Sequence, residues 1–230
     1  RTVPPSLHRD VLAEFTNDIR SALAQQLDAA VEDRAWAQAK LSIKRAGLGL
    51  RATEDHASAA FLASVSSAQE LCKSLDAAFD PDDAGGHLQL ELANTQFRES
   101  IVPDAIVEAS SRKHSQKFLS SLIDAKLEQD LRGHQEADAS FKAHLSLQTL
   151  HGAGAWLTAH PCDEARAMDP VICKVALKRR LRMRVQEADT FCPMCGGTMD
   201  TFGDHALVCP CRGDRTIRHN RLRDTVYEDS

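Results

Sequence analysis

The chain has 230 residues, of which 43% are hydrophobic, and a formal net charge of −5 at pH 7. This length and apolar content predict a folded protein with a substantial core and exclude an intrinsically disordered chain. No apolar run approaches the roughly twenty residues that a membrane helix needs, and the N-terminal residues lack the apolar segment of a secretion signal, so we expect a soluble protein that does not bind membranes.

The hydrophobic pattern predicts a mainly α fold. Apolar residues recur every four positions from Leu7 to Leu27, which is the spacing of one face of an amphipathic helix. Thr53, Glu54 and Asp55 resemble a helix start, and no helix-breaking residue follows before Leu75. We therefore expect a helical bundle, with helices over 7–27, a short stretch after Asp33, 53–75, 88–97 and 115–147, the last as one long or two shorter helices.

Several residues in this bundle could suggest a function, but packing explains them better. Gly47 and Gly49 lie in a small apolar loop and allow close backbone packing, since a phosphate-binding loop would need a third glycine and a preceding strand. His56 is interpreted as a polar residue in the first turn of its helix. Trp156, near the end of the bundle, is expected to pack in the core.

Asp169 and Pro170 form a strong start for a helix that we expect to reach Arg184. On this helix one line of residues is apolar and the adjacent line is basic, so one face is expected to pack and the next to face phosphate. The apolar line is Cys173, Leu177 and Leu181, and the basic line is Lys174, Lys178 and Arg182.

Four candidate metal ligands, Cys192, Cys195, His205 and Cys209, follow within eighteen residues. The Cys-x2-Cys turn directs two thiolates to one point, and two ligands four residues apart share a helical face, so the array predicts a structural Zn²⁺ site. Four protein ligands leave no open position for catalysis.

The residues around this array fit the same interpretation. Gly196 and Gly197 allow a tight backbone after the second thiolate, and Asp204 is expected to cap the short helix that carries the last two ligands. Cys211 and His219 are the spare candidates. Cys211 ranks well behind Cys209, because an offset of six from His205 does not share its helical face.

Positive charge is concentrated around the metal array. Residues 174–223 contain eleven Lys or Arg and five Asp or Glu, a local charge of +6, whereas the rest of the chain carries 17 basic and 28 acidic residues, or −11. Basic runs on both sides of a zinc site indicate a nucleic-acid-binding surface. The expected contacts are Lys174, Lys178, Arg179, Arg182, Arg212, Arg215, Arg218, His219, Arg221 and Arg223.

The seven cysteines do not form the pattern of a disulfide-rich secreted protein. Four cluster at the metal array, three as candidate ligands and Cys211 as the spare candidate, and Cys72, Cys162 and Cys173 are scattered singly. A reducing, intracellular compartment is expected. The chain also lacks an initiator Met, and a basic helix expected from about residue 215 is still continuing at Ser230, so we expect it to be part of a longer protein.

A series of short motifs in this order resembles the C-terminal part of non-LTR (LINE-like) retrotransposon reverse transcriptases. The most specific are Gly203-Asp204-His205-Ala206-Leu207-x-Cys209 and Arg218-His219-Asn220-x-Leu222-Arg223-Asp224. The others are Arg1-Thr2-Val3-Pro4-Pro5, Ala46-Gly47-Leu48-Gly49-Leu50-Arg51, Gly154-Ala155-Trp156-Leu157 and Cys192-Pro193-Met194-Cys195-Gly196. Two positions depart from the family, because Ala46 stands where a third glycine is usual and Cys211 where a glycine is common.

The resemblance implies a helical thumb-like region at 1–80, a helical linker at 87–185 and a CCHC zinc knuckle with a basic C-terminal helix at 186–230. It implies a nuclear protein that binds element RNA or target DNA during target-primed reverse transcription and continues from an upstream polymerase palm. The polymerase's aromatic-x-Asp-Asp motif is absent, since the only tyrosine, Tyr227, begins Tyr-Glu-Asp-Ser. Without paired carboxylates for two metal ions, this segment is not expected to be an enzyme.

Two other functions are compatible with parts of the sequence. A zinc deaminase could use His134-Gln135-Glu136 with Cys192 and Cys195, but that motif requires Pro directly before the first Cys, where Phe191 stands. A helical interaction scaffold, stapled by zinc and binding an acidic protein surface, is not excluded by charge alone.

Overall fold

The structure is a computed structural model of the chain, and it describes residues 3–78, 84–105, 115–134, 137–161 and 167–211 together with Thr216 and Asn220. The described residues are mainly helical, as predicted, with one two-stranded sheet. None of the described helices is long and apolar enough to cross a bilayer.

The chain divides into two compact units, Arg1–Pro161 and Cys162–Ser230. This division differs from the expected regions 1–80, 87–185 and 186–230. Helices before and after residue 80 share one core, because α3 packs against both α4 and α6. The helix that starts at Pro170 belongs to the second unit, where Arg179 donates to the Phe202 carbonyl, and Arg182, just after the helix, pairs with Asp204.

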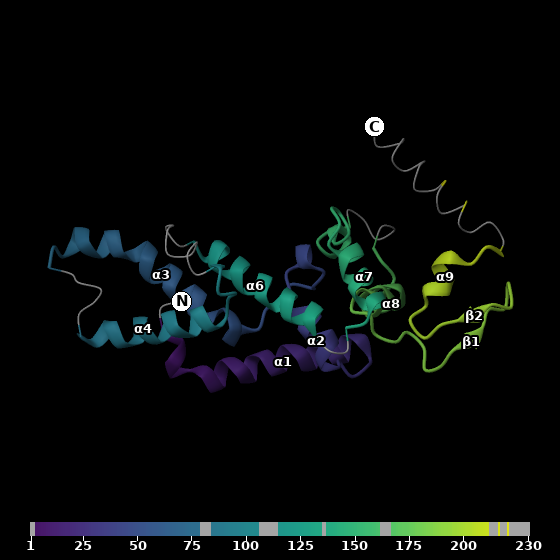
Figure 1. The fold of residues 1–230 in the computed structure, drawn as a ribbon, viewed down its shortest axis with the longest axis horizontal. Coiled ribbons are helices and arrows are strands. Elements are labelled where there is room, and N and C mark those ends of the chain that lie inside the picture. Colours follow the sequence, from purple (N-terminus) through teal and green to yellow (C-terminus); the bar gives the residue numbers. More distant parts are fainter. Residues whose placement is uncertain are drawn as a thin grey trace. The chain divides into compact units, whose positions relative to one another are not determined.

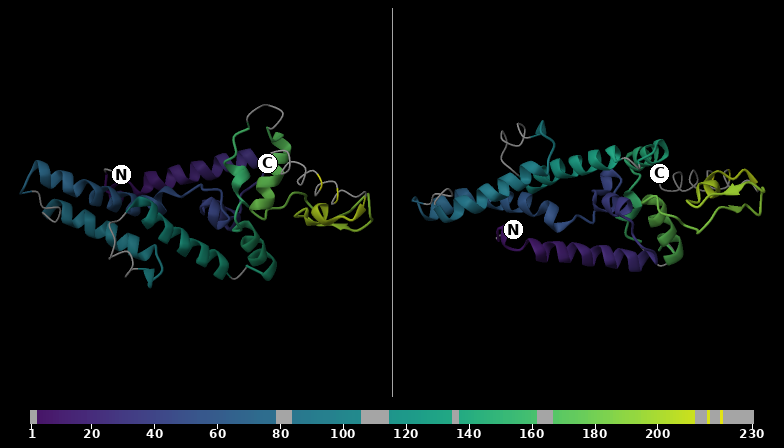
Figure 2. Two further views of the ribbon diagram at one scale, coloured as in Figure 1. Left: turned by 90° about the horizontal axis from the view of Figure 1, so that it is seen from above. Right: turned by 60° about the horizontal axis from the view of Figure 1, so that its bottom comes forward.

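The first unit is a helical bundle. Its long helices α1, α3, α4 and α6 run roughly along the same direction in Figure 1, and Figure 2 shows the hairpin of α3 and α4 from two further sides. The predicted region 115–147 forms two helices rather than one. The elements are η1 (Pro5–Leu7), α1 (Arg9–Leu27), α2 (Asp33–Lys40), η2 (Ile43–Arg45), α3 (Thr53–Leu75), α4 (Ala84–Glu99), α6 (Gln116–Gly133), α7 (Ala139–Gln148) and η3 (Ala155–Leu157).

The main core of this unit lies where α3 meets α4 and α6. Ala59 of α3 is fully buried, and small side chains of this kind let helix backbones approach closely. Phe97 of α4 and Ile123 of α6 fill the same cluster, at 4% and 1% exposure. Burying a side chain of this size contributes about 2–3 kcal/mol, so this cluster is a substantial source of stability for the bundle.

The second core cluster joins the end of α2 to α6 and α7, and a tight loop closes it. Gly47 has no room for a side chain, because a Cβ there would lie 1.9 Å from the Leu41 carbonyl oxygen. Ala46 adopts a left-handed conformation, with φ of 71°, which glycine adopts without strain. The left-handed conformation at Ala46 explains why a glycine would suit position 46. The cluster contains Leu41, Ala46, Leu131, Ala137, Phe141 and Leu145.

The predicted first helix is present as α1, but only part of its apolar line is buried. Leu23 and Leu27 are buried, whereas Val11 is 61% and Phe15 54% exposed. Thr16 is buried instead, and its hydroxyl accepts a 3.0 Å hydrogen bond from the Thr53 N–H at the start of α3. The packing of α1 on α3 therefore uses a face offset from the apolar line over the first half of the helix.

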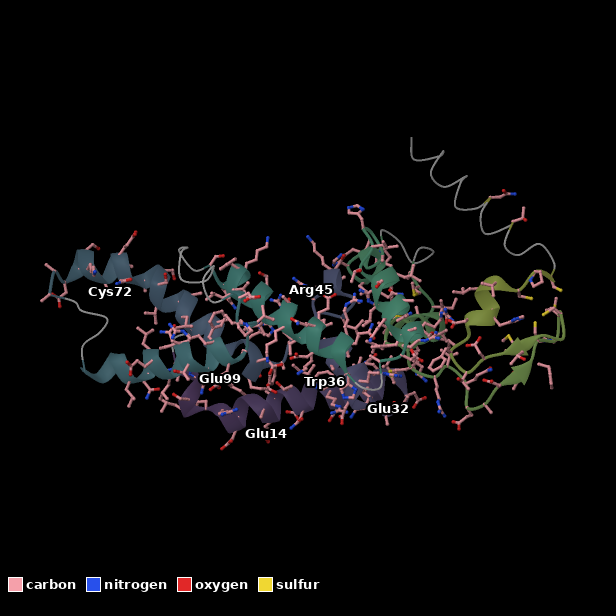
Figure 3. All side chains as sticks on the ribbon, in the orientation of Figure 1. Glu14, Glu32, Trp36, Arg45, Cys72 and Glu99 are labelled. Atoms are coloured by element: carbon pink, nitrogen blue, oxygen red, sulfur yellow. The ribbon has the colours of Figure 1, made fainter. Side chains whose placement is uncertain are left out.

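The burial of two tryptophans and of His56 differs in part from the prediction. Trp156 lies in η3 and is half-buried rather than fully buried in the core. His56 is not a simple first-turn polar residue, since it is buried at 7% exposure. By contrast Trp36, on the short helix after Asp33, is buried at 8% exposure. It is labelled in Figure 3.

The second unit starts with α8 (Pro170–Arg180), and Asp169 caps it as predicted by accepting a 2.8 Å hydrogen bond from the Val171 N–H. The helix ends at Arg180 and not at Arg184. The helix terminates there because Arg182 adopts a left-handed conformation, with φ of 51°, and the Met183 N–H donates to the Lys178 carbonyl at 2.8 Å. The remaining elements are β1 (Thr190–Phe191), β2 (Thr198–Met199) and α9 (Asp204–Val208).

Candidate metal centre

The four predicted ligands come from two elements of the second unit. Strands β1 and β2 pair antiparallel, with Phe191 opposite Thr198, and the turn between them contains Cys192 and Cys195. Two short backbone hydrogen bonds close this turn, from Cys192 N–H to the Gly197 carbonyl at 2.7 Å and from Gly196 N–H to the Cys192 carbonyl at 2.9 Å. The strands were not predicted, because two residues each are too few to show an alternating pattern.

The other two ligands lie on α9 and directly after it. His205 is the second residue of the helix and Cys209 is its C-cap, whose N–H donates to the His205 carbonyl at 2.8 Å. The spacing of four residues thus becomes one helical turn, as predicted. Figure 3 shows sulfur atoms gathered beside α9 and the hairpin.

The four ligand atoms converge on one point. All lie within 4.8 Å of one another, with Cys192 Sγ 3.8 Å from Cys209 Sγ and Cys195 Sγ 3.2 Å from His205 Nε2. A tetrahedral centre with metal–sulfur bonds of about 2.3 Å has sulfur–sulfur edges of about 3.8 Å. The cluster can therefore hold a metal ion, and it includes Cys209 and not Cys211.

Backbone N–H groups of the turn donate to both of its cysteine sulfurs. The N–H groups of Met194 and Cys195 point at the Cys192 sulfur and lower its pKa to about 6, so this thiol ionises near neutral pH. The Gly197 N–H donates to Cys195 and lowers its pKa, but desolvation and the neighbouring Cys192 and Cys209 sulfurs outweigh it and raise the pKa overall. A bound cation would relieve this crowding of thiolates.

Glycine is favoured at two positions of this turn. Gly196 has φ of 70°, in the left-handed region. A Cβ on Gly197 would lie 3.1 Å from the His205 ring and 3.3 Å from the Cys195 sulfur. Both glycines were expected to allow a tight backbone, and the structure gives each a specific reason.

Asp200, and not Asp204, caps the helix that carries the last two ligands. One oxygen of Asp200 accepts hydrogen bonds from Phe202 N–H at 2.9 Å and Asp204 N–H at 3.1 Å, and the other accepts from His205 N–H at 2.8 Å. Burial alone would raise the pKa of Asp200, but these three donors outweigh it and lower the pKa. The prediction that Asp204 is the cap is wrong, because Asp204 already lies inside the helix and Gly203 is its N-cap.

Asp204 instead joins α8 to the loop that carries the candidate ligand His205, in a set of contacts that we call the arginine clamp: Arg179, Arg182, Phe202 and Asp204. Arg182 Nη1 lies 2.7 Å from one Asp204 oxygen, and Arg179 Nη2 lies 3.1 Å from the other. Arg179 also donates to the Phe202 carbonyl at 2.8 Å, and the Arg182 guanidinium lies 4.2 Å from the Phe202 ring centre. The clamp holds the residue next to His205 in place.

The clamp changes the interpretation of the basic line on α8. Arg179 and Arg182 were expected to contact nucleic acid, yet both guanidinium groups donate within the protein. Lys174 and Lys178 are half-buried, and Arg184, just after the helix, is exposed. Arg180, which was not among the expected contacts, is buried at 2% exposure. The other expected contacts lie outside the described residues: Arg212, Arg215, Arg218, His219, Arg221 and Arg223.

The residues that support the candidate ligands follow no pattern in the sequence. Asp200 and Phe202 have no regular spacing to Cys192 or Cys195, so only the folded loop shows that one caps the helix and the other stacks on an arginine. His134, which a deaminase would use as a ligand, lies at the end of α6 in the first unit and is not in the cluster. No protein-family model, curated protein or solved structure matches the chain.

Proposed function

We propose that the chain is a noncatalytic nucleic-acid-binding segment of a non-LTR retrotransposon reverse transcriptase, in which a structural zinc ion fixes a basic module. The observation that carries the proposal is the convergence of three cysteines and one histidine within a run of strongly positive charge. The motifs that resemble this family, notably Gly203-Asp204-His205-Ala206-Leu207-x-Cys209, support the same assignment.

Zinc is the metal that this cluster fits best. Three thiolates and one imidazole form a soft, four-ligand set, which tetrahedral Zn²⁺ prefers and for which Mg²⁺ and Ca²⁺ are poorly suited. The set is complete without water or substrate, so the ion would stabilise the fold and would not act in catalysis. Bound zinc would tie the β1–β2 hairpin to α9, and its ligation energy would be local folding energy.

The nucleic acid is RNA or DNA bound mainly through its phosphates. Lys178 and Arg184 are the cations of the α8 region that we propose as contacts, together with the basic residues from Arg212 onward. Contacts to phosphate position a protein on the strand but carry little sequence information, so weak sequence preference is expected. The polymerisation chemistry would belong to an upstream palm of the same polyprotein.

The test is binding of a fluorescently labelled RNA to the zinc-loaded chain, measured by anisotropy at several salt concentrations. The logarithm of the binding constant should fall linearly with the logarithm of the salt concentration. Replacing Lys178 and Arg184 with Ala should weaken binding and reduce the slope by about 0.7–0.9 per lost phosphate contact. Glu187→Gln, at a neighbouring exposed position, is the control with the opposite expected sign, because it removes a negative charge and should not weaken binding. A binding constant that does not change with salt concentration would contradict the proposal.

A protein-interaction scaffold is the second candidate, and one observation favours it. The first turns of α8 expose Val171, Ile172 and Val175, at 67%, 61% and 40%. Exposed apolar side chains grouped on one helix can mark a protein contact. If this surface binds a protein, replacing Val171 and Ile172 with Ser should abolish that contact while leaving RNA binding unchanged.

A further inference from the structure

Helix α1 exposes large apolar side chains on the side that does not pack. Val11 is 61% and Phe15 54% exposed, and Leu7, just before the helix, is 61% exposed. Val11 and Phe15 stand four residues apart, so they lie one above the other on a single face of the helix. The packing of α1 on α3 uses a different side, where Thr16 is buried. Figures 1 and 2 show α1 along the edge of the bundle, where a further molecule has access to it.

A line of acidic side chains runs beside these apolar residues. Asp10 and Glu14 directly precede Val11 and Phe15, and Asp18 follows one turn later at the same spacing. All three acidic residues are exposed, and none forms an ion pair with another described residue. Asp10 lies in the first turn of α1, where a negative charge stabilises the helix, but Glu14 and Asp18 lie beyond that turn. Glu14 is labelled in Figure 3. We call these residues the acidic-apolar face of α1: Asp10, Val11, Glu14, Phe15 and Asp18.

The arginines of α1 do not neutralise the acidic line. Arg20 pairs with Asp33 at 2.8 Å. Arg9 lies two residues before Val11, which places it about 200° round the helix. Residues 1–161 carry 22 acidic and 16 basic side chains, a net charge of −6. A surface of this sign repels RNA, DNA and anionic membranes, so its charge selects a cationic partner.

We propose that the acidic-apolar face of α1 binds a basic amphipathic helix of a partner protein. The apolar side chains of such a helix, spaced three and four residues apart, would pack on Val11 and Phe15. Its Lys and Arg residues beside that line would pair with Glu14 and Asp18, in the way that charges beside a coiled-coil seam select the partner. An acidic helix or a purely polar helix would lack one of these two interactions. The inference goes beyond the proposed function, because it gives the first unit a protein partner and depends neither on zinc nor on nucleic acid.

The test is binding of a fluorescently labelled synthetic helix to the full chain, measured by anisotropy. The peptide, about 18 residues of leucine and lysine with leucine at helical spacing, has one apolar face flanked by lysine. It should bind saturably, and more weakly as salt is added. A peptide with glutamate in place of every lysine, and a peptide of the same composition with its leucines spread round the helix, should each bind at least about tenfold more weakly. Absence of binding by the first peptide, or equal binding of all three, would overturn the inference.

Apolar variants locate the binding. Val11→Ser combined with Phe15→Ser should weaken binding of the lysine peptide at least about tenfold. The matched control is Leu147→Ser combined with Leu150→Ser, which also removes two exposed apolar side chains of the first unit and should leave the affinity unchanged. Because all four side chains are exposed, the variants should keep the fold. Equal loss in the two double variants would overturn the inference.

Charge-reversed variants test the electrostatic contribution. Glu14→Lys combined with Asp18→Lys should weaken binding of the lysine peptide and strengthen binding of the glutamate peptide. Glu99→Lys combined with Asp104→Lys makes the same change in net charge at other exposed positions and should have a much smaller effect. Equal effects of both variants would show that only net charge matters and would overturn the inference. Sedimentation that shows a wild-type dimer, lost in the Val11 and Phe15 variant, would also overturn it, because the occupant would then be a second copy.

Discussion

Replacing Arg182 with Ala should weaken metal binding although Arg182 is not a ligand. The side chain is 15% exposed, pairs with Asp204 at 2.7 Å and lies 4.2 Å from the Phe202 ring centre. Because Asp204 is about half exposed, the ion pair contributes about 0.5–1 kcal/mol, and the cation–π contact contributes about as much. The variant should lose about 1–2 kcal/mol.

This loss of folding free energy lowers the metal affinity, because metal ligation and local folding are coupled. At about 1.4 kcal/mol per tenfold, the apparent metal affinity should fall by about 5–30-fold. Arg182 has left-handed backbone, and Ala is strained there in the same way, so the substitution removes the side-chain contacts and leaves the backbone strain unchanged.

Competition with a chromophoric zinc chelator measures the effect. Arg184→Ala is the control, because Arg184 is equally basic, lies two residues away and is exposed. If Arg182 served only to contact phosphate, as the sequence suggested, both variants would keep the wild-type zinc affinity and would weaken RNA binding alike. That result would refute the structural role of the arginine clamp.

Two further changes test the first unit. Gly47→Ala should lower the free energy of unfolding by about 3 kcal/mol or more, because its Cβ would meet the Leu41 carbonyl, whereas Gly133→Ala, with nothing within 4 Å, should change it by no more than about 1 kcal/mol in denaturant unfolding. Stability should also fall as the pH drops below 6.5. The unfolded chain protonates His56 at its ordinary pKa while burial keeps the folded pKa lower, so His56→Gln should flatten this fall in thermal unfolding between pH 7.5 and 5.5. An unchanged pH profile would contradict the burial of a neutral His56.

The cluster of four candidate metal ligands could be predicted because its members are local. Cys192 and Cys195 share one turn, and His205 and Cys209 share one helical turn, so the sequence spacing nearly determines the geometry. Helix positions in the bundle could be predicted for a similar reason, since repeating apolar residues and caps such as Asp169 act over one or two turns.

Contacts between distant residues could not be predicted. His56 and Asp124 are 68 positions apart, and only the packing of α3 on α6 brings them together. Arg182 belongs to a basic line that looks solvated, and its pairing with Asp204 depends on how the loop after β2 folds back. Val11 and Phe15 follow the helical period but are exposed. Periodicity predicts that this segment is a helix, but it does not predict which face of the helix packs against the rest of the bundle.

The most direct test is elemental analysis of the purified chain and of two cysteine variants. The wild-type chain and Cys211→Ser should each bind one zinc ion per chain, whereas Cys209→Ser should lose stoichiometric zinc, since Cys209 and not Cys211 belongs to the four-ligand cluster. Wild-type chain without zinc, or zinc retained by Cys209→Ser and lost by Cys211→Ser, would contradict the proposed metal centre.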